Sequence, residues 1–544
     1  MSAKSTHLPF PGVQHGKRII ISVIEQRARD EPNSSWISIP VDEGKVCEGY
    51  RDITFKQLND AANHAAQWLL HNLPPSSRSF QCFAYAGPKD LRYPILALAA
   101  GKLQKKLILP NLSMMPENHA HVLRKAECEV YLSTKHVAND IKAALEHAPE
   151  IQYMDAPSLD DLFRDTEPIA IEYTKPWDDA KDDPWLVFHS SGTTGPPKPI
   201  THTFRMVANL EAPASLPDVA ESHIHQYANK RWYTHLPTLH YVGMVTVLFI
   251  PPFVNMTAIL PPPDQSPENV AKILRYARAD GAICTPLLLS QMLSFTDGAE
   301  ALKSLEYVHY AGAPLARHLG NQIISDTKLA PLIGCTESGH HFTETRPDDK
   351  EDWDYFKFQP HAGVEFEHRA DDFYEMVFVR RPECVMQPIF IAFPELERFE
   401  TKDLWVQHPT RKGLWKIVCR MDDFVSLTDA KGYFVSPFER EIEQHPRVEA
   451  ALIGGNGYSD LVLLLEITNG VNVDTESGRR SFFESLEPYL SRISDSSLLK
   501  LEPKLTIIAR KDKPFVRTIK GTLARVPTLQ LYEDDIAALF DGST

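Results

Sequence analysis

Residues 188–199 read FHSSGTTGPPKP, a run of small hydroxyl-bearing residues and glycines that ends at a lysine and a proline. Glycines in such a run let backbone N–H groups turn inward and surround an anion. Serine and threonine hydroxyls add hydrogen-bond donors, and the lysine adds a mobile positive charge. The chemistry that these residue types support is phosphate binding. The expected ligands are Ser190, Ser191, Gly192, Thr193, Thr194, Gly195 and Lys198.

The run differs from two other loops with known chemistry. A Walker A loop needs G-x-x-x-x-G-K-[ST], whereas Pro197 precedes the lysine here and Pro199 follows it. A nucleophile elbow needs G-x-S-x-G, and neither Ser190 nor Ser191 stands in that pattern. A flexible surface turn is a reasonable alternative for SGTTG alone, but it does not explain the whole run.

The stretch WLVFH (185–189) predicts a buried strand, so the run lies at the carboxyl end of that strand. Ligands of open α/β sheets bind at this end. Three further apolar stretches, YPILALAAG, GAICTP and LEYVHYAG, predict more strands. Helical patterns alternate with them, which favours an α/β fold with mostly parallel sheets flanked by helices.

The ends of two helices can be predicted from local signals. Thr54 with Gln57 three residues later is a capping-box pattern before apolar positions at helical spacing. Ser266 and Pro267 indicate the start of a second helix, which we expect Gly281 to stop.

After about residue 420 the pattern changes to short strands such as EAALIGG and DLVLLLEI between helices such as SFFESLEPYLSRI. We interpret residues 422–544 as a separate, small α+β domain, and residues 1–421 as the large N-terminal domain.

Composition limits the function classes. A chain of 544 residues with 43% hydrophobic and 24% charged residues is a globular protein of more than one domain. The net charge of −15 disfavours nucleic acid as a partner. Seven scattered cysteines suggest neither a disulfide framework nor a zinc site. With no leader or membrane span recognised in the sequence, we expect a cytoplasmic protein that does not bind membranes.

The whole run ending in proline and lysine resembles the phosphate-binding signature of adenylate-forming enzymes, which include acyl-CoA synthetases, luciferases and adenylation domains of nonribosomal peptide synthetases (NRPS). Further stretches resemble motifs of this family in the family's order. YAGAPLA (310–316) resembles the adenine pocket, and LIGCTESG (332–339) resembles the G-x-T-E motif. FETKDLW (399–405), CRMDD (419–423) and RTIKGTLAR (517–525) resemble the ribose, hinge and catalytic-lysine segments.

The resemblance implies ATP and Mg²⁺ as cofactors and a role for each matching residue. Thr336 would bind phosphate and Glu337 would hold Mg²⁺, a hard cation that prefers oxygen ligands. Asp422 would be the pivot of a mobile C-terminal domain, and Lys520 would reach the reacting carboxylate. The remaining nucleotide contacts would be Gly312, Ala313, Pro314, Ile333, Asp403 and Arg420.

Three positions depart from the family pattern. The aromatic residue that usually stacks on adenine is Ile333, which implies aliphatic contact with the base. Lys402 stands where glycine usually separates threonine from aspartate, and Cys419 stands where glycine usually precedes Arg420. These changes affect local geometry and leave the expected reaction class unchanged.

The stretch THLPTLHYVGM (234–244) resembles the segment that contacts the acid substrate. His240 would lie next to the carboxylate, and Tyr241 replaces the aspartate that pairs with the α-ammonium of amino acids. Such a pocket favours a small aryl acid over an amino acid or a long acyl chain. The other expected walls are Cys284, His309, Ala311, Leu332 and His340, although a histidine such as His309 is more often a satisfied core residue.

The end of the chain resembles adenylation domains of fungal NRPS-like carboxylic acid reductases. The resemblance implies a thiol acceptor, either phosphopantetheine on a carrier domain or CoA, and carrier and reductase domains in cis or in trans. A free-standing acyl- or aryl-CoA ligase is an alternative. A non-catalytic nucleotide-binding regulator and a luciferase-like oxygenase are the alternatives from other classes.

Overall fold

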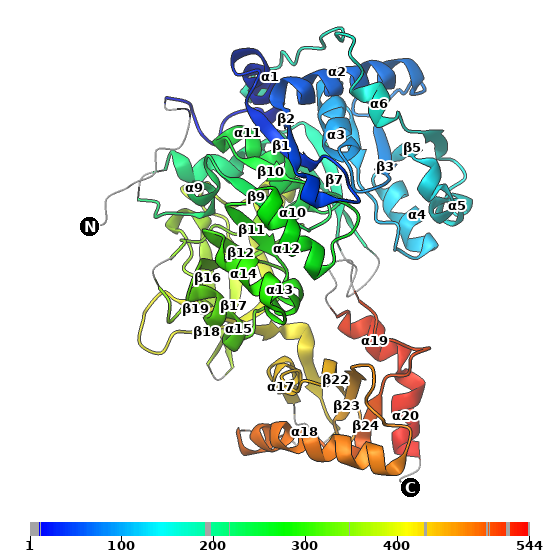
Figure 1. Ribbon diagram of the computed structural model, residues 1–544, viewed down its shortest axis with the longest axis vertical. Coiled ribbons are helices and arrows are strands. Elements are labelled where there is room, and N and C mark those ends of the chain that lie inside the picture. Colours follow the sequence, from blue (N-terminus) through cyan, green and yellow to red (C-terminus); the bar gives the residue numbers. More distant parts are fainter. Residues whose placement is uncertain are drawn as a thin grey trace. The chain divides into compact units, whose positions relative to one another are not determined.

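The structure is a computed structural model that describes residues 10, 12–190, 197–216, 218–346, 349–370, 372–428, 432–496, 499, 501–517 and 523–541. The chain divides into two compact units. The first consists of Met1–Val364 and Phe378–Phe399, and the second of Glu365–Val377 and Glu400–Thr544 (Figure 1). The domain boundary expected after residue 421 stays a prediction.

The first unit contains a six-stranded sheet in the order β6-β5-β3-β4-β7-β8. All its neighbouring strands are parallel except β7 and β8, which are antiparallel. Its strands are β3 (Cys82–Ala86), β4 (Lys106–Ile108), β5 (Cys128–Ser133), β6 (Gln152–Asp155), β7 (Pro184–His189) and β8 (Pro199–Thr203).

A seven-stranded sheet in the order β13-β12-β11-β9-β10-β1-β2 belongs to the same unit. It is parallel except for the antiparallel pair β1 and β2. Its strands are β1 (Ser35–Pro40), β2 (Tyr50–Thr54), β9 (Arg231–Thr234), β10 (Thr257–Ile259), β11 (Gly281–Cys284), β12 (Tyr307–Tyr310) and β13 (Lys328–Pro331).

The helices and sheets of the first unit (Figure 1) pack in layers that are held together by three hydrophobic clusters. The largest cluster joins one face of each sheet to α1 (Ile20–Asp30), α2 (Phe55–Asn72), α3 (Arg92–Lys102) and α11 (Pro251–Val254). The second covers the other face of the seven-stranded sheet with α12 (Pro267–Tyr276), α13 (Pro286–Leu293), α14 (Thr296–Lys303) and α15 (Arg317–Ile324). The third covers the other face of the six-stranded sheet with α4 (Pro116–Lys125) and α5 (Ala138–Glu146).

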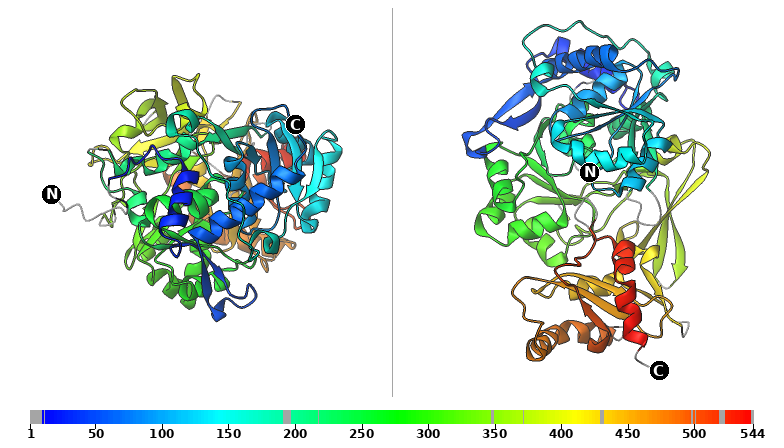
Figure 2. Two further views of the ribbon diagram at one scale, coloured as in Figure 1. Left: turned by 90° about the horizontal axis from the view of Figure 1, so that it is seen from above. Right: turned by 90° about the vertical axis from the view of Figure 1, so that its right-hand side faces the viewer.

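The second unit contains a small sheet in the order β22-β23-β24, with β22 and β23 antiparallel. One face packs on helices α17 and α18, and the other packs on α20 (Figure 2). The bounds are β22 (Val448–Gly454), β23 (Val462–Ile467), β24 (Thr506–Ile508), α17 (Ser436–Ile442), α18 (Glu476–Ser496), α19 (Arg525–Leu531) and α20 (Glu533–Asp541).

A four-stranded sheet precedes it in the chain, formed by β16 (Val364–Ala370), β17 (Phe373–Val379), β18 (Arg398–Gln407) and β19 (Trp415–Arg420). The short elements are α6 (Leu159–Leu162), α7 (Trp177–Ala180), α8 (Phe204–Ala208), α9 (His223–Tyr227), α10 (Tyr241–Met244), α16 (Ile389–Ala392), β14 (Gly334–Cys335), β15 (Gly339–His340), β20 (Phe424–Ser426) and β21 (Gly432–Phe434). The predicted α/β class, with large parallel sheets and a smaller α+β domain, is confirmed.

Two sequence-based predictions of local structure are wrong. YPILALAAG is not a strand but lies in α3, where Tyr93 to Lys102 are buried on every face. A helix that is buried all round has no polar face, so its sequence cannot be told from a buried strand. The second predicted helix ends at Tyr276, and Gly281 begins strand β11, where the ring of Trp232 leaves no room for a Cβ atom.

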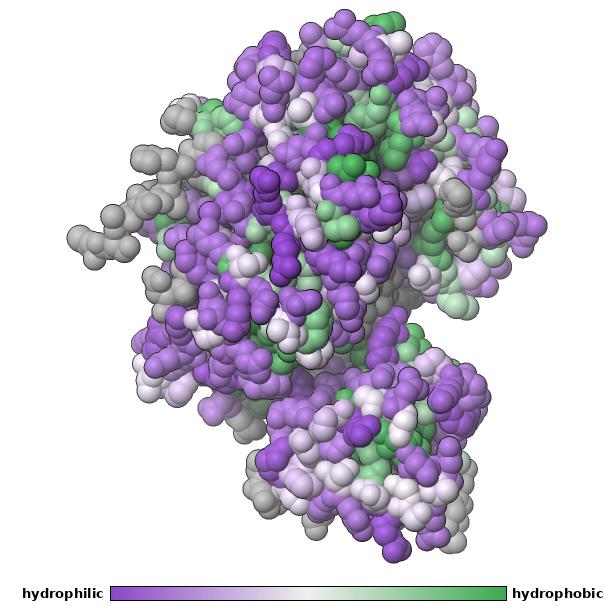
Figure 3. All heavy atoms as spheres, in the orientation of Figure 1, coloured by the Kyte–Doolittle hydropathy of each residue, from purple (hydrophilic) through white to green (hydrophobic). Residues whose placement is uncertain are grey.

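The surface seen in Figure 3 is mainly hydrophilic, with apolar side chains in small groups. Among the described residues, no helix is both long enough and apolar enough to cross a membrane.

Candidate active site

The ends of the predicted phosphate loop are fixed by two reciprocal hydrogen bonds. Ser190 N–H donates to the Lys198 carbonyl at 3.0 Å, and Lys198 N–H donates to Ser190 Oγ at 3.0 Å. These bonds continue the antiparallel pairing of β7 with β8. The loop therefore emerges at the carboxyl end of β7, as predicted. Five of the predicted phosphate ligands lie outside the described residues: Ser191, Gly192, Thr193, Thr194 and Gly195.

Parallel strands bring the other predicted segments of the first unit to one edge of the seven-stranded sheet. Segments 235–240, 311–314 and 332–340 follow the carboxyl ends of β9, β12 and β13. In the second of these segments, Gly312, Ala313 and Pro314 are exposed. Gly312 has φ of +94°, with open space around a hypothetical Cβ atom. An exposed backbone of this kind can approach a flat base closely.

Thr336 and Glu337 lie in the turn of a small antiparallel hairpin formed by β14 and β15. Both residues are partly exposed. Gly339 has φ of +66°, a conformation that favours glycine. The turn offers a carboxylate and a hydroxyl oxygen side by side, and this donor set fits Mg²⁺. No group of three or more His, Cys, Asp or Glu residues suited to a metal occurs in the described ranges.

His202, which the sequence analysis did not single out, connects this turn to β8, the strand that follows the phosphate loop. It lies on β8, is fully buried, and its Nε2 atom is 2.9 Å from the Thr336 carbonyl oxygen. Its ring also packs against the ring of Tyr241, with the centroids 4.9 Å apart. The two bonded residues are 134 positions apart in the sequence, so no local sequence pattern predicts this hydrogen bond. The one available signal was a histidine at a position of β8 that strand alternation predicts to be buried.

The acid-binding segment begins at His240, which caps α10 and whose N–H donates to the Pro237 carbonyl at 3.0 Å. Tyr241 follows and packs against Phe188 and Phe249 as well as His202. Burial raises the pKa of Tyr241 above its ordinary value, so the phenol stays neutral. A cationic α-ammonium group would find no carboxylate at this position.

Two of the predicted pocket histidines are linked through a third histidine. His223 packs edge-on against His309 and against His340, with centroid distances of 4.9 and 5.5 Å. Burial lowers the pKa of His309 to about 3 and that of His340 to about 4, so both rings are neutral at physiological pH. His309 is a satisfied core residue, because its two ring nitrogens lie 3.1 Å from Tyr227 Oη and 2.7 Å from Gln226 Oε1.

The sheet separates Cys284 from this group. Cys284 pairs with Tyr310 in the β11–β12 register, and both side chains belong to the cluster under α12 to α15. His309 pairs with Ile283 and faces the other side. Burial raises the pKa of Cys284 to about 12. Leu332 packs against the central cluster between the sheets, and Ala311 N–H donates to the Cys284 carbonyl at 3.1 Å.

In the second unit, the predicted ribose ligands Asp403 and Arg420 are cross-strand partners on β18 and β19. Arg420 Nη1 lies 3.0 Å from Asp403 Oδ1. Lys402 has φ of +60°, which explains why glycine is usual at this position. Lys402 N–H donates to Glu375 Oε1 at 3.0 Å, which holds this backbone conformation. Cys419 is buried, so its side chain fills space in the core.

The predicted hinge residue Asp422 lies in the short helical turn Met421–Asp423. The neighbouring carboxylate of Asp423 accepts hydrogen bonds from Ser436 Oγ at 2.6 Å and Arg525 Nε at 3.0 Å. Arg525 also pairs with Glu439. Arg525 begins α19, the helix after the segment that contains Lys520; Lys520 itself lies outside the described residues.

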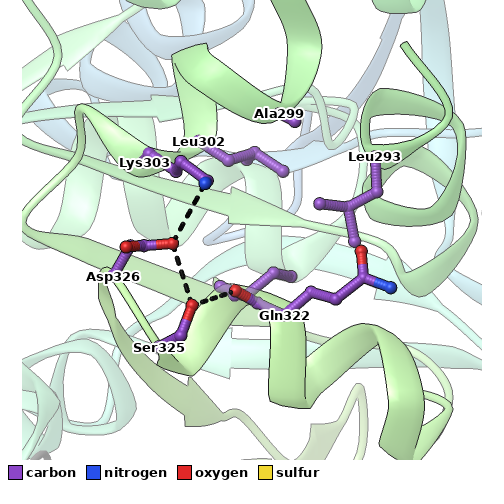
Figure 4. A pocket seen from close by; sticks show the side chains of 8 residues that line it. Leu293, Ala299, Leu302, Lys303, Gln322, Ser325 and Asp326 are labelled. Atoms are coloured by element: carbon purple, nitrogen blue, oxygen red, sulfur yellow. Dashed lines mark hydrogen bonds and ion pairs between the residues drawn. The ribbon is translucent and has the colours of Figure 1, made fainter. Parts of the chain in front are cut away.

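A separate pocket of about 240 Å³ lies among α13, α14 and α15 (Figure 4). Its polar groups are paired with one another: Lys303 Nζ is 3.3 Å from Asp326 Oδ2, and Ser325 Oγ is 2.8 Å from the same carboxylate. None of the predicted site residues lines it. We therefore place the candidate site at the strand ends and not in this pocket.

Comparison with known proteins matches both parts of the chain to one family. Residues 24–366 match the family described as AMP-binding enzyme, and residues 422–544 match the AMP-binding enzyme C-terminal domain. The crystal structure of the anthranilate CoA ligase AuaEII in complex with anthranoyl-AMP has the same fold. Its TM-score is 0.72 at 16% identity, and the match covers 97% of this chain and 98% of that one.

Two fungal relatives are much longer than this chain. The isocyanide synthase–NRPS hybrid crmA of Aspergillus fumigatus is 28% identical over 540 residues, which are 97% of this chain and 34% of that protein. A carboxylic acid reductase of Neurospora crassa is 26% identical over 544 residues, which are 97% of this chain and 51% of that protein. The chain thus spans a third to a half of their lengths.

The backbone of Lys402 generates a prediction for the ribose segment. A left-handed φ costs an ordinary residue about 1 kcal/mol and costs a β-branched residue more. We expect Lys402→Val to lower the free energy of unfolding, measured by urea titration, by about 2 kcal/mol, whereas Lys402→Gly is tolerated. Equal stability of the two variants would contradict this account of the position.

Proposed function

Because the chain belongs to the AMP-binding enzyme family, we propose that it activates a carboxylic acid with ATP as an adenylate-forming ligase. The products of this step are an acyl-adenylate and pyrophosphate. The recognition of the adenylate-forming family from six sequence motifs is confirmed. The observation that carries the proposal is the hydrogen bond from β8, the strand leaving the phosphate loop, to the Thr336–Glu337 turn.

The physical task is to bring two anions together, the carboxylate and the α-phosphate of ATP. Such a reaction depends on charge neutralisation and on alignment for in-line attack. We assign the phosphates to the loop that Ser190 and Lys198 close, and the base to the exposed backbone around Gly312. Mg²⁺, held by Glu337 together with the nucleotide, would supply further charge neutralisation.

In the first step a carboxylate oxygen forms a bond to the α-phosphorus, and the bond from that phosphorus to the bridging oxygen of pyrophosphate breaks. We assign Lys520 to the developing charge on both groups. In the second step a thiol sulfur attacks the acyl carbon, AMP leaves with the former carboxylate oxygen, and the thiol proton passes to solvent. Between the two steps, rotation of the C-terminal domain at Asp422 would withdraw Lys520 from the acyl-adenylate and give the thiol access to it.

We propose phosphopantetheine on a carrier domain as the thiol, with a reductase domain acting next, as in a carboxylic acid reductase. The similarity to the Neurospora crassa carboxylic acid reductase supports this choice. CoA is the alternative acceptor, and the fold shared with the anthranilate CoA ligase supports it.

For the acid we propose a small aryl carboxylate. Tyr241 offers an aromatic face and no counter-charge for an α-ammonium group, and burying that cation without a partner would cost several kcal/mol. His340 and the neighbouring His223 are neutral imidazoles, because burial lowers the pKa of each, and their ring nitrogens can hydrogen-bond to polar substituents of the acid. Cys284 is omitted from this pocket because it faces the opposite side of the sheet.

A panel of acids tests this function. We expect benzoate-type acids to support ATP–pyrophosphate exchange at least about tenfold faster than proteinogenic amino acids or palmitate, a difference of about 1.4 kcal/mol in activation free energy. Tyr241→Asp should reduce exchange with the aryl acids. An unmodified amino acid as the best substrate would contradict the pocket assignment, and no exchange with any acid would favour a nucleotide-binding regulator.

The assignment of Lys520 leads to a separate prediction. Loss of one electrostatic donor to a transition state typically costs about 3 kcal/mol, or a hundredfold or more in rate. We expect Lys520→Ala to slow exchange by about that factor while the thermal unfolding temperature stays unchanged. Exchange at the wild-type rate would remove Lys520 from the adenylation step.

A further inference from the structure

His202 is the described side chain that joins two motifs far apart in the sequence. It is the fourth residue of β8, four positions after Lys198, and its side chain is fully buried. Within the described residues, its hydrogen bond is to the main-chain oxygen of Thr336, at 2.9 Å. The strand that leaves the phosphate loop therefore contacts the turn that carries Glu337.

The direction of this bond is fixed by its chemistry. A carbonyl oxygen only accepts, so the proton must reside on Nε2 of His202. Burial lowers the pKa of His202 to about 4, and the ring is therefore neutral at physiological pH. The other nitrogen, Nδ1, is buried and has no hydrogen-bond partner within the part of the chain that the structure describes. The ring is thus oriented by a single hydrogen bond and by packing.

Packing completes the orientation. The ring of Phe188 on β7 meets His202 edge-on with the centroids 5.0 Å apart, and Tyr241 contacts it at 4.9 Å. The Tyr241 hydroxyl also reaches the stem of the hairpin, since it lies 3.2 Å from where a Cβ atom on Gly339 would stand. The hairpin is consequently supported at its turn by His202 and at its stem by Tyr241.

We propose that His202 is a positioning residue, which fixes the Thr336–Glu337 turn relative to β8 so that the Glu337 carboxylate can hold Mg²⁺ against the nucleotide. The inference rests on the proposed function, because it takes Glu337 as the metal ligand. A hydrogen bond that orients a metal-binding segment typically changes metal affinity ten- to a hundredfold when it is lost.

The experiment measures how Mg²⁺ promotes ATP binding in the intact chain. The thermal unfolding temperature is followed at fixed ATP while Mg²⁺ is titrated, and the Mg²⁺ concentration at the midpoint of the rise is compared between variants. His202→Leu removes the donor, whereas His202→Gln keeps an amide N–H near the position of Nε2. His119→Leu is the matched control, because His119 is equally buried and its Nε2 lies 3.2 Å from Tyr131 Oη.

We expect His202→Leu to raise the Mg²⁺ midpoint about tenfold, with His202→Gln and His119→Leu within about threefold of the wild type. The proposal is overturned if His202→Leu keeps the wild-type midpoint, or if His119→Leu shifts it as much. Should His202→Leu fail to fold, His202→Asn, whose shorter amide cannot reach Thr336, replaces it under the same criteria.

The outcomes also separate this inference from the proposed function. A wild type that shows Mg²⁺-dependent ATP binding but no exchange with any acid would refute acid activation and leave the His202 comparison valid. A wild type whose ATP-dependent stabilisation does not respond to Mg²⁺ would overturn both.

Discussion

The antiparallel pairing of β7 with β8 is the constraint on which the candidate site depends. The rest of the sheet is parallel, but β8 runs back alongside β7 from the edge where β7 ends. Ser190 and Lys198 close the loop by exchanging hydrogen bonds. The return strand then carries His202 inward, because alternate residues of a strand face opposite sides. One pairing therefore fixes both the ends of the phosphate loop and the donor that reaches Thr336.

The candidate site has neutral buried histidines, and the cations that we assign to it are lysines. Burial lowers the pKa values of His202 and His340 to about 4, so neither adds positive charge near the nucleotide at neutral pH. The positive charge for the phosphates would come instead from the exposed Lys198 and, in our proposal, from Lys520. In our proposal, neutral His202 holds the turn in place without attracting the phosphates away from the metal, and the long lysine side chains follow a charge that moves during the reaction.

Much of the fold could be predicted because its signals are local. The capping box of Thr54 and Gln57 is present at the start of α2, and three of the four predicted strands of the first unit are found. The fourth predicted strand lies in helix α3, which is buried on all faces. Gly281 does not stop α12, which ends at Tyr276, but begins β11 in tight packing against Trp232. At Lys402 the sequence comparison was informative. The family usually has glycine at this position, and the backbone of Lys402 does have a positive φ.

The part of the candidate site that could be predicted is the part that the order of motifs along the chain identifies. Motif order indicated the turn at Thr336 and Glu337, and the parallel sheet brings these segments to one edge. Cys284 and His309 lie on opposite faces of the sheet because adjacent positions in paired strands alternate between the two faces. The motif alignment alone does not say which face each residue takes. The contact of His202 with Thr336 depends on the packing of one sheet against the other, and no pattern within either segment specifies it.

Our central claim is that a carboxylate of the substrate attacks the α-phosphate of ATP. The most direct measurement uses an accepted aryl acid with both carboxylate oxygens labelled with ¹⁸O, together with ATP and a thiol acceptor, and analyses the products by mass spectrometry. The account predicts one ¹⁸O atom in AMP and none in pyrophosphate, because the oxygen that forms the new bond to phosphorus stays with AMP when the thiol attacks the acyl carbon. Label in orthophosphate, or release of ADP in place of AMP, would contradict the claim.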